Sequence, residues 1–192
     1  MHGFWLCFVP LFVAVDAVGV LPVFLSLTEG IERPGVRRVI WQSLITGSLV
    51  AIVFVVIGKA VFRLLGISPS DFMIAGGILL FAISLRDILV INKHQDPVDT
   101  DSLGAVPIGI PLIVGPAVLT TILLLVDQYG IKPTLTAAIV NILLAGLIFR
   151  FAGSIGGLLG RAGTKAVSKL ASLLLAAIAV MMVRKGIMQF MH

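Results

Sequence analysis

Long apolar runs separated by short polar intervals make up almost the whole chain. Six such runs can be read, at residues 3–27, 39–58, 72–91, 105–126, 134–152 and 170–191. Each is close to the ~20 residues that an α-helix needs to cross the hydrocarbon core of a bilayer. The runs are continuously apolar and do not alternate with a period of two, which favours helices over a β-barrel. The pattern therefore predicts an all-α membrane protein with six transmembrane helices.

The longest polar interval divides these six runs into two groups of three. We expect a first three-helix repeat at residues 1–91, a polar linker at 92–104 and a second repeat at 105–192. Because three crossings reverse the direction of the chain, the second repeat must be inverted relative to the first. Residues 66–88 align with residues 164–186 without a gap, which places Arg86 on Arg184.

Composition agrees with a multi-pass protein of the cell membrane, whether inner or plasma membrane. Hydrophobic residues make up 59% of the chain and charged residues 12%, and the mean hydropathy is +1.16. The net charge of +5 does not indicate a nucleic-acid partner, because the basic residues lie at helix ends and not along one face.

The basic residues instead predict how the helices are oriented. Nine of the 14 fall on one predicted side and five on the other. The first set is Arg33, Arg37, Arg38, Arg86, Lys93, Arg150, Arg161, Lys165 and Lys169, and the second is Lys59, Arg63, Lys132, Arg184 and Lys185. The positive-inside rule then places the first set in the cytoplasm and both termini outside.

Candidate catalytic chemistry is sparse. The single cysteine, Cys7, excludes an internal disulfide, and no Cys/His cluster has the spacing of a metal site. No nucleophile–base pair, phosphate loop or carboxylate pair can be assembled, so we expect neither an enzyme nor a bound cofactor.

An acid lies in the middle of the first apolar run, where a charge is costly. Asp16 is followed by Gly19 and Pro22 in otherwise apolar sequence. An ionised carboxylate at mid-membrane costs at least ~2.5 kcal/mol unless it has water or a partner. We therefore expect Asp16 to be a proton or cation site, the alternative being a structural hydrogen bond to a broken helix end.

Proline and glycine interrupt the first and fourth runs in matching places. Leu21–Pro22 and Gly115–Pro116 are predicted to unwind their helices and to leave backbone groups unpaired. Paired broken helices at membrane depth are typical of a transporter site, and half-helix N-termini there attract carboxylates. The hydroxyl groups of Ser26, Thr28, Thr120 and Thr121 can face a polar solute or bond their own helix backbone.

Two further features concern helix packing and charge. Gly76 and Gly77 predict a close crossing of two helices, because small residues let backbones approach. Arg86 and Arg184 lie about a turn inside their helix ends. They either reach the headgroups or serve as charge partners of Asp16.

At these residues the chain resembles the MarC family of integral membrane proteins, which includes SnatA-type small neutral amino-acid transporters. Four blocks in the right order carry the resemblance: DAVGVLPVFLSLT at 16–28, IAGGILLF at 74–81, VPIGIPLIVGP at 106–116 with Thr120 and Thr121, and LLAAIAV at 174–180. The resemblance covers nearly all of the chain. It implies a six-helix inverted-repeat fold and, for the best-understood branch, proton-coupled movement of glycine or alanine.

Several positions depart from the family pattern inside the expected site. The first family motif usually reads Asp-Pro-x-Gly-Asn-x-Pro, but here Ala17 replaces its first proline and Val20 its asparagine. Ala117 ends a motif that usually reads Gly-Pro-Gly. Met73 stands for a common arginine and Met181 for a glutamine. Val20, Met73 and Met181 each lack a polar group of the family pattern, which leaves open both the substrate and whether the site is active.

The sequence thus predicts a secondary transporter of small neutral amino acids with a midplane site between helices 1 and 4. The expected binding residues are Asp16, Gly19, Val20, Pro22, Ser26, Gly115, Pro116, Thr120 and Thr121. The expected partners are a small-molecule solute, the lipid bilayer and a coupling proton or sodium ion. An exporter of another metabolite or drug and a non-transporting scaffold are the alternatives. The direction of transport and the oligomeric state, a homo-oligomer included, stay open.

Overall fold

The computed structural model describes residues 2–89 and 103–191, apart from the side chains of His2 and of residues 86–87, 153–162, 164–165, 167–168 and 190–191. Every element in this described part is a helix. In chain order the helices are α1 (His2–Val15), α2 (Ala17–Leu27), α3 (Arg33–Leu65), α4 (Pro69–Leu89), η1 (Gly104–Ile113), α6 (Pro116–Tyr129) and α7 (Ile131–Met191). The predicted linker lies almost entirely outside the described residues.

The described helices include several that can cross a bilayer. Four stretches are long and apolar enough, namely Gly3–Leu27, Arg33–Leu65, Ile131–Ala152 and Lys169–Gln189. The pair η1 and α6, bent by 55° at its break, makes a fifth if it is one span. The third predicted run falls in α4, where the described apolar stretch, Pro69–Leu85, is shorter than a full crossing. The all-helical architecture with four or five candidate spans is confirmed for the described residues, and the count of six and the inverted repeat stay predictions.

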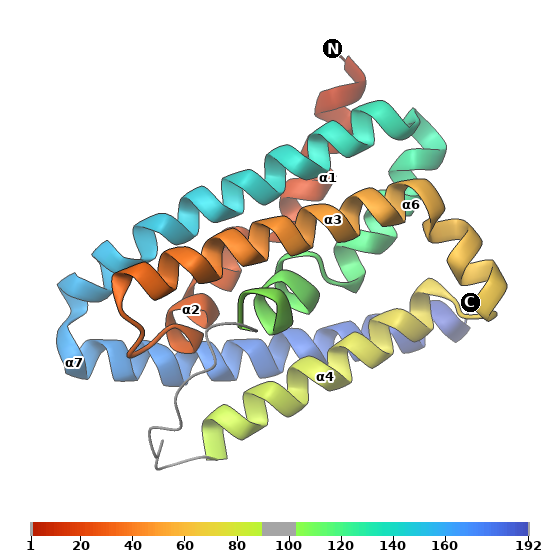
Figure 1. Ribbon diagram of the computed structural model, residues 1–192. Helices are drawn as coiled ribbons and strands as arrows, with labels where there is room; N and C mark the ends of the chain where they lie inside the picture. Colours follow the sequence, from red (N-terminus) through yellow and green to blue (C-terminus); the bar gives the residue numbers. More distant parts are fainter. Residues whose placement is uncertain (1, 90–102, 192) are drawn as a thin grey trace.

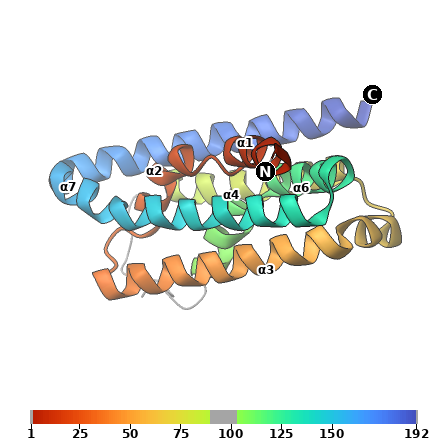
Figure 2. The ribbon, with the colours of Figure 1, turned by 90° about the horizontal axis from the view of Figure 1, so that it is seen from above.

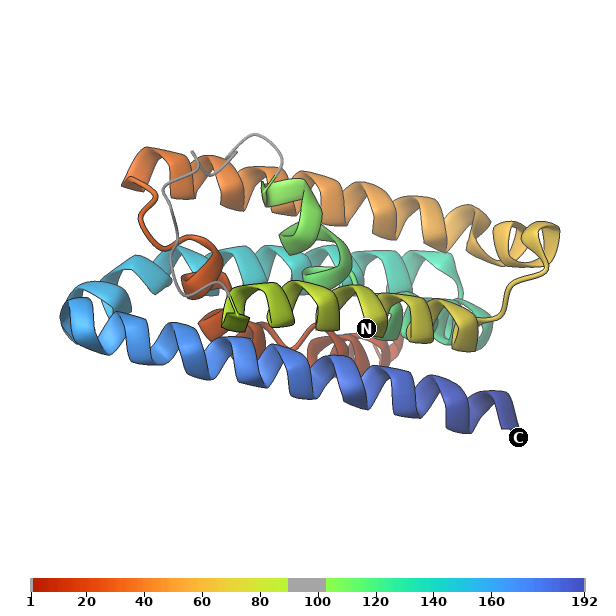
Figure 3. The ribbon, with the colours of Figure 1, turned by 90° about the horizontal axis from the view of Figure 1, so that it is seen from below.

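Four long rods run side by side along the molecule. Helix α7 reverses its direction, so its first arm (residues 131–152) and its second arm (residues 169–189) are antiparallel (Figure 1). The first arm lies near α3, and the second arm lies near α4 when the molecule is seen from above and from below (Figures 2 and 3). The short helices α1, α2, η1 and α6 fill the space among these rods (Figure 1).

Glycines allow the rods to approach closely at two crossings. A Cβ atom on Gly77 of α4 would lie 2.8 Å from the carbonyl oxygen of Ala179 in the second arm of α7. A Cβ on Gly76 would lie 2.4 Å from Cγ of Pro116. The close crossing predicted at this glycine pair is therefore confirmed. A Cβ on Gly146, in the first arm, would meet Leu44 of α3 at 2.7 Å.

Polar side chains fasten the short helices to the rods. Asn141 Nδ2 of α7 donates a hydrogen bond to the carbonyl oxygen of Phe8 in α1, at 3.2 Å. Cys7 Sγ and Thr134 Oγ1 lie 3.7 Å apart at the same contact. Interhelical hydrogen bonds of this kind contribute roughly 0.6–2 kcal/mol in a membrane.

Candidate functional site at two helix breaks

The first span breaks at Asp16, between α1 and α2. Asp16 has φ 42° and ψ 51°, in the left-handed region, which aspartate and asparagine tolerate better than most residues. Its Oδ1 accepts a hydrogen bond from the backbone N–H of Gly19 at 3.1 Å. The carboxylate thus caps the N-terminus of α2, which stabilises a new helix start.

The position of this break differs from the prediction. We expected unwinding at Leu21–Pro22, but α2 runs from Ala17 through Pro22 to Leu27, so that prediction is wrong. The turn at Asp16 already redirects the chain upstream. Pro22 is the sixth residue of α2 and lies inside it, so the helix continues there with one backbone hydrogen bond fewer.

The second break lies at Val114–Gly115, where η1 ends and α6 begins. Gly115 is the N-cap of α6, Pro116 is at the start of the helix, and no described side chain caps it. A Cβ on Gly115 would lie 2.3 Å from the carbonyl oxygen of Pro111, so only glycine fits this backbone. Proline suits the first position of a helix, where its missing N–H has no partner to lose. This break occurs where the sequence predicts it.

Helix η1 is itself irregular. Val106 and Ile110 have extended backbone angles inside it, and each precedes a cis proline, Pro107 and Pro111. Its end residue, Ile113, is almost fully buried. Val106 is 55% exposed and Ile110 is half-buried, so the protein encloses the irregular backbone at the Ile113 end of this helix and only partly at Val106.

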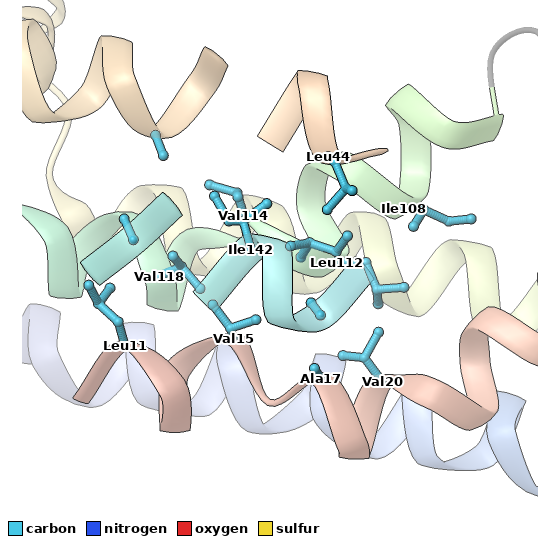
Figure 4. Packing of buried hydrophobic residues seen from close by; sticks show 14 of the residues in the cluster. Leu11, Val15, Ala17, Val20, Leu44, Ile108, Leu112, Val114, Val118 and Ile142 are labelled. Atoms are coloured by element: carbon cyan, nitrogen blue, oxygen red, sulfur yellow. The ribbon is translucent and has the colours of Figure 1, made fainter. Parts of the chain in front are cut away.

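Apolar side chains fill the space between the two breaks. Val15 and Ala17 flank Asp16 and belong to one buried cluster with Leu112, Val114 and Ile142 (Figure 4). Asp16 itself is exposed at the surface of the bundle. Apolar packing therefore separates Asp16 from the break at Gly115 in this structure.

The predicted hydroxyl ligands bond their own helices. Thr120 Oγ1 donates to the carbonyl oxygen of Pro116 and Thr121 Oγ1 to that of Ala117, each at 2.8 Å. Thr28 Oγ1 likewise donates to Phe24 O at 2.7 Å. Ser26 is buried, and its carbonyl oxygen accepts a hydrogen bond from the backbone N–H of Glu29 at 3.3 Å. Of the two roles expected from the sequence, the three threonine hydroxyls take the second, a hydrogen bond to their own helix backbone.

The remaining predicted residues lie at different depths. Val20 and Pro116 are buried, whereas Gly19 and Pro22 are half-buried. Arg184 is exposed and lines a shallow apolar groove of about 410 Å³ between α4 and the second arm of α7. Within the described part of the chain neither Asp16 nor Arg184 forms an ion pair. The side chain of Arg86 lies outside the described residues.

Sequence reasoning missed one charged contact. Lys59 of α3 and Asp127 of α6 form an ion pair. The two residues are separated by 68 positions, so no local spacing rule connects them. The only signal was that each carries a charge at the end of an apolar run.

Comparison with known proteins agrees with the helical membrane architecture. The family model described as MarC family integral membrane protein matches residues 1–191. A UPF0056 membrane protein of Methanocaldococcus jannaschii is 32% identical over 192 residues, which cover 94% of this chain and 84% of the relative. The UPF0056 inner membrane protein YhgN of Escherichia coli is 30% identical over 188 residues, which cover 94% of each chain. No solved structure matches the chain.

Proposed function

We propose, since the chain belongs to the MarC family of integral membrane proteins, that it is a secondary transporter of small neutral amino acids such as glycine and alanine. The solute binds near the middle of the bilayer, between the break at Asp16 and the break at Gly115. A proton, or else a sodium ion, is the coupling ion. The protein acts in the cell membrane with both termini outside, and it is not an enzyme.

The observation that carries this proposal is the unequal capping of the two breaks. Helix α2 is capped by the carboxylate of Asp16, whereas α6 begins at Gly115 without a cap from any described side chain. A free helix N-terminus favours an anionic group through its amides and its dipole. The carboxylate of a zwitterionic solute suits α6, and its ammonium group suits Asp16 and the carbonyl groups that end α1.

An inverted repeat of two three-helix units is the architecture that we infer for this site. One shift of 98 residues, the difference between positions 131 and 33, relates the starts of α3 at Arg33 and of the first arm of α7 at Ile131. The same shift relates the break at Asp16 to Val114. It is also the shift of the gap-free alignment of residues 66–88 with 164–186.

Contacts between α4 and the second arm of α7 support the inverted repeat. A shift of 98 residues should exchange the two partners of a contact between these helices. Lys169 Nζ lies 3.5 Å from the carbonyl oxygen of Ile88. The same shift carries Ile88 onto Gly186 and Asp71 onto Lys169. A similar contact lies one position away, because a Cβ on Gly186 would lie 2.9 Å from the carbonyl oxygen of Ser70, the neighbour of Asp71. A two-fold axis in the membrane plane produces such exchanged pairs.

The crossing of α3 with the first arm of α7 behaves in the same way. Gly47 lies against Ile142, and Gly146 lies against Leu44. The shift of 98 residues exchanges these two contacts to within one position. Transport then consists of rocking one repeat against the other, which must open the apolar packing between the breaks.

Uptake and counterflow of radiolabelled glycine and alanine in proteoliposomes test the proposal. Asp16→Asn is the informative variant, because asparagine keeps both the N-cap and the left-handed backbone while it removes the charge. We expect wild type to respond to a pH gradient, or to a sodium gradient, and Asp16→Asn to lose that response. Glu32→Gln is the matched control, since Glu32 is an exposed carboxylate that makes no side-chain cap.

A non-transporting scaffold is the second candidate. The capping role of Asp16 and the apolar packing between the breaks favour it. If folded wild type moves neither solute under any gradient, the scaffold or an exporter of another metabolite or drug replaces the amino-acid proposal. Normal gradient-driven transport by Asp16→Asn would remove the coupling role from Asp16.

A further inference from the structure

A groove of about 710 Å³ opens between α2, α3 and the first arm of α7, away from the two helix breaks. Its lining combines charged residues at one end with apolar residues along its length. Its charged lining residues are Glu29, Arg33, Arg37 and Arg150, and its apolar lining includes Trp41 and Leu143.

The charged end of the groove is strongly basic. Arg33 and Arg37 come from α3 and Arg150 from α7, against one acid, Glu29. All three arginines are exposed, and among the described residues none of them forms an ion pair. Arginine forks match phosphate oxygens well, so this end is complementary to a phosphate or carboxylate group.

The rest of the groove is apolar. Phe24 and Phe149 stack in it, with ring centroids 4.4 Å apart and planes 8° apart. The side chains of Trp41 and Leu143 are more than half exposed there, at 62% and 52%. A small polar solute finds no hydrogen-bond partners on such a surface, whereas an acyl chain can cover it through apolar contact.

The position of the groove in the bilayer fits its two ends. Arg37 and Lys59 lie 22 positions apart on α3, which is about 33 Å along a helix and close to the ~30 Å of the hydrocarbon core. Arg37 therefore lies at one headgroup layer when Lys59 lies at the other. Trp41, one turn further into the membrane, is at the depth that tryptophan prefers.

We propose that this groove binds an anionic phospholipid, with its headgroup phosphate on Arg33, Arg37 and Arg150 and an acyl chain along Trp41 and Leu143. A basic pocket between membrane helices is suited to such headgroups. Three arginines against one acid favour an anionic lipid over phosphatidylcholine, whose quaternary ammonium they repel. This assignment is independent of any transport activity.

The test compares the full chain in nanodiscs of phosphatidylcholine with and without phosphatidylglycerol. Thermal unfolding and native mass spectrometry of retained lipid are the two measurements. We expect phosphatidylglycerol to raise the Tm of wild type and to be retained. Arg37→Gln/Arg150→Gln should weaken its retention about tenfold or more, since each basic side chain near the surface adds to anionic-lipid binding.

The control variant Arg63→Gln/Lys132→Gln removes two basic residues from the opposite end of the same rods. It should retain phosphatidylglycerol as wild type does. All variants should share one Tm in pure phosphatidylcholine, which shows that they are folded. Equal loss of lipid in both double variants would overturn the proposal, because binding would then follow net charge alone.

Two further outcomes also count against this site. Inorganic phosphate that stabilises the protein as well as phosphatidylglycerol does would show a site for a free anion. Unchanged lipid retention by Arg37→Gln/Arg150→Gln would show that the arginines do not hold the headgroup. Trp41→Ala should reduce lipid retention without changing any effect of phosphate, which separates the apolar surface from the basic end.

Discussion

Lys59 and Asp127 join α3 of the first half of the chain to α6 of the second half through an ion pair. Their side chains are 45% and 52% exposed. Next to this pair α3 and α6 pack closely, because a Cβ on Gly58 would lie 3.0 Å from a methyl group of Leu123. At this end of the bundle the two halves are held together.

This ion pair should contribute little to the free energy of unfolding. Because both side chains are about half exposed, Asp127→Asn should lower the free energy of unfolding by no more than about 1 kcal/mol. Thermal unfolding in mild detergent at low and high salt measures this. The exchanged variant Lys59→Asp/Asp127→Lys should recover stability relative to either single change, and its failure to do so would show that the pairing itself is not what matters.

The sidedness of the loops can be read with cysteine labelling. The one native cysteine, Cys7, is fully buried, so an added cysteine reports alone. A membrane-impermeant maleimide applied to intact cells should spare Glu32→Cys and label Leu65→Cys and Gln128→Cys, all at exposed positions. The basic residues predict this pattern. Labelling of all three positions from one side would contradict the predicted topology.

Gly115→Ala should destabilise the protein. The added methyl group would meet the carbonyl oxygen of Pro111 at 2.3 Å, and backbone cannot move aside as a side chain can. We expect a loss of roughly 1–3 kcal/mol, measured by thermal unfolding. Gly3→Ala is the matched control, since its nearest neighbour would be a side-chain atom of Pro133 at 3.7 Å. It should be neutral or slightly stabilising.

Gly146→Ala contrasts with Gly115→Ala, because its added methyl group meets a side chain and not the backbone. A second substitution at that side chain should relieve the clash. Its Cβ would meet only side-chain atoms of Leu44, at 2.7 to 3.0 Å. Gly146→Ala and Leu44→Ala should each destabilise, and the double variant should be more stable than the sum of the two predicts. A coupling of about 0.5–3 kcal/mol in a double-mutant cycle is the expected size. Strict additivity would mean that the two side chains do not meet.

Much of the helical architecture follows from the apolar pattern. The predicted run at residues 3–27 coincides with the span Gly3–Leu27, and the runs at 134–152 and 170–191 fall within a few residues of described spans. The length of an apolar run predicts these helices because a helix needs ~20 apolar residues to cross the hydrocarbon core. The break at Gly115–Pro116 could also be predicted, because proline favours the first position of a helix whatever the tertiary contacts.

Other features depend on contacts that no local pattern encodes. The turn at Asp16 replaces the expected break at Pro22, because a hydrogen bond to Gly19 and a left-handed backbone together make a helix start. The ion pair of Lys59 with Asp127 and the arginine-lined groove join distant parts of the chain. These residues lie close together only in the packed structure, so their sequence positions do not predict the contacts.

The backbone of Asp16 limits what evolution can place at this position. A residue with φ 42° is easily replaced only by asparagine or glycine. Asparagine also keeps the helix cap. One substitution can therefore remove the charge while the fold survives, so descendants of this chain can lose or regain a carboxylate at the break while they keep the fold.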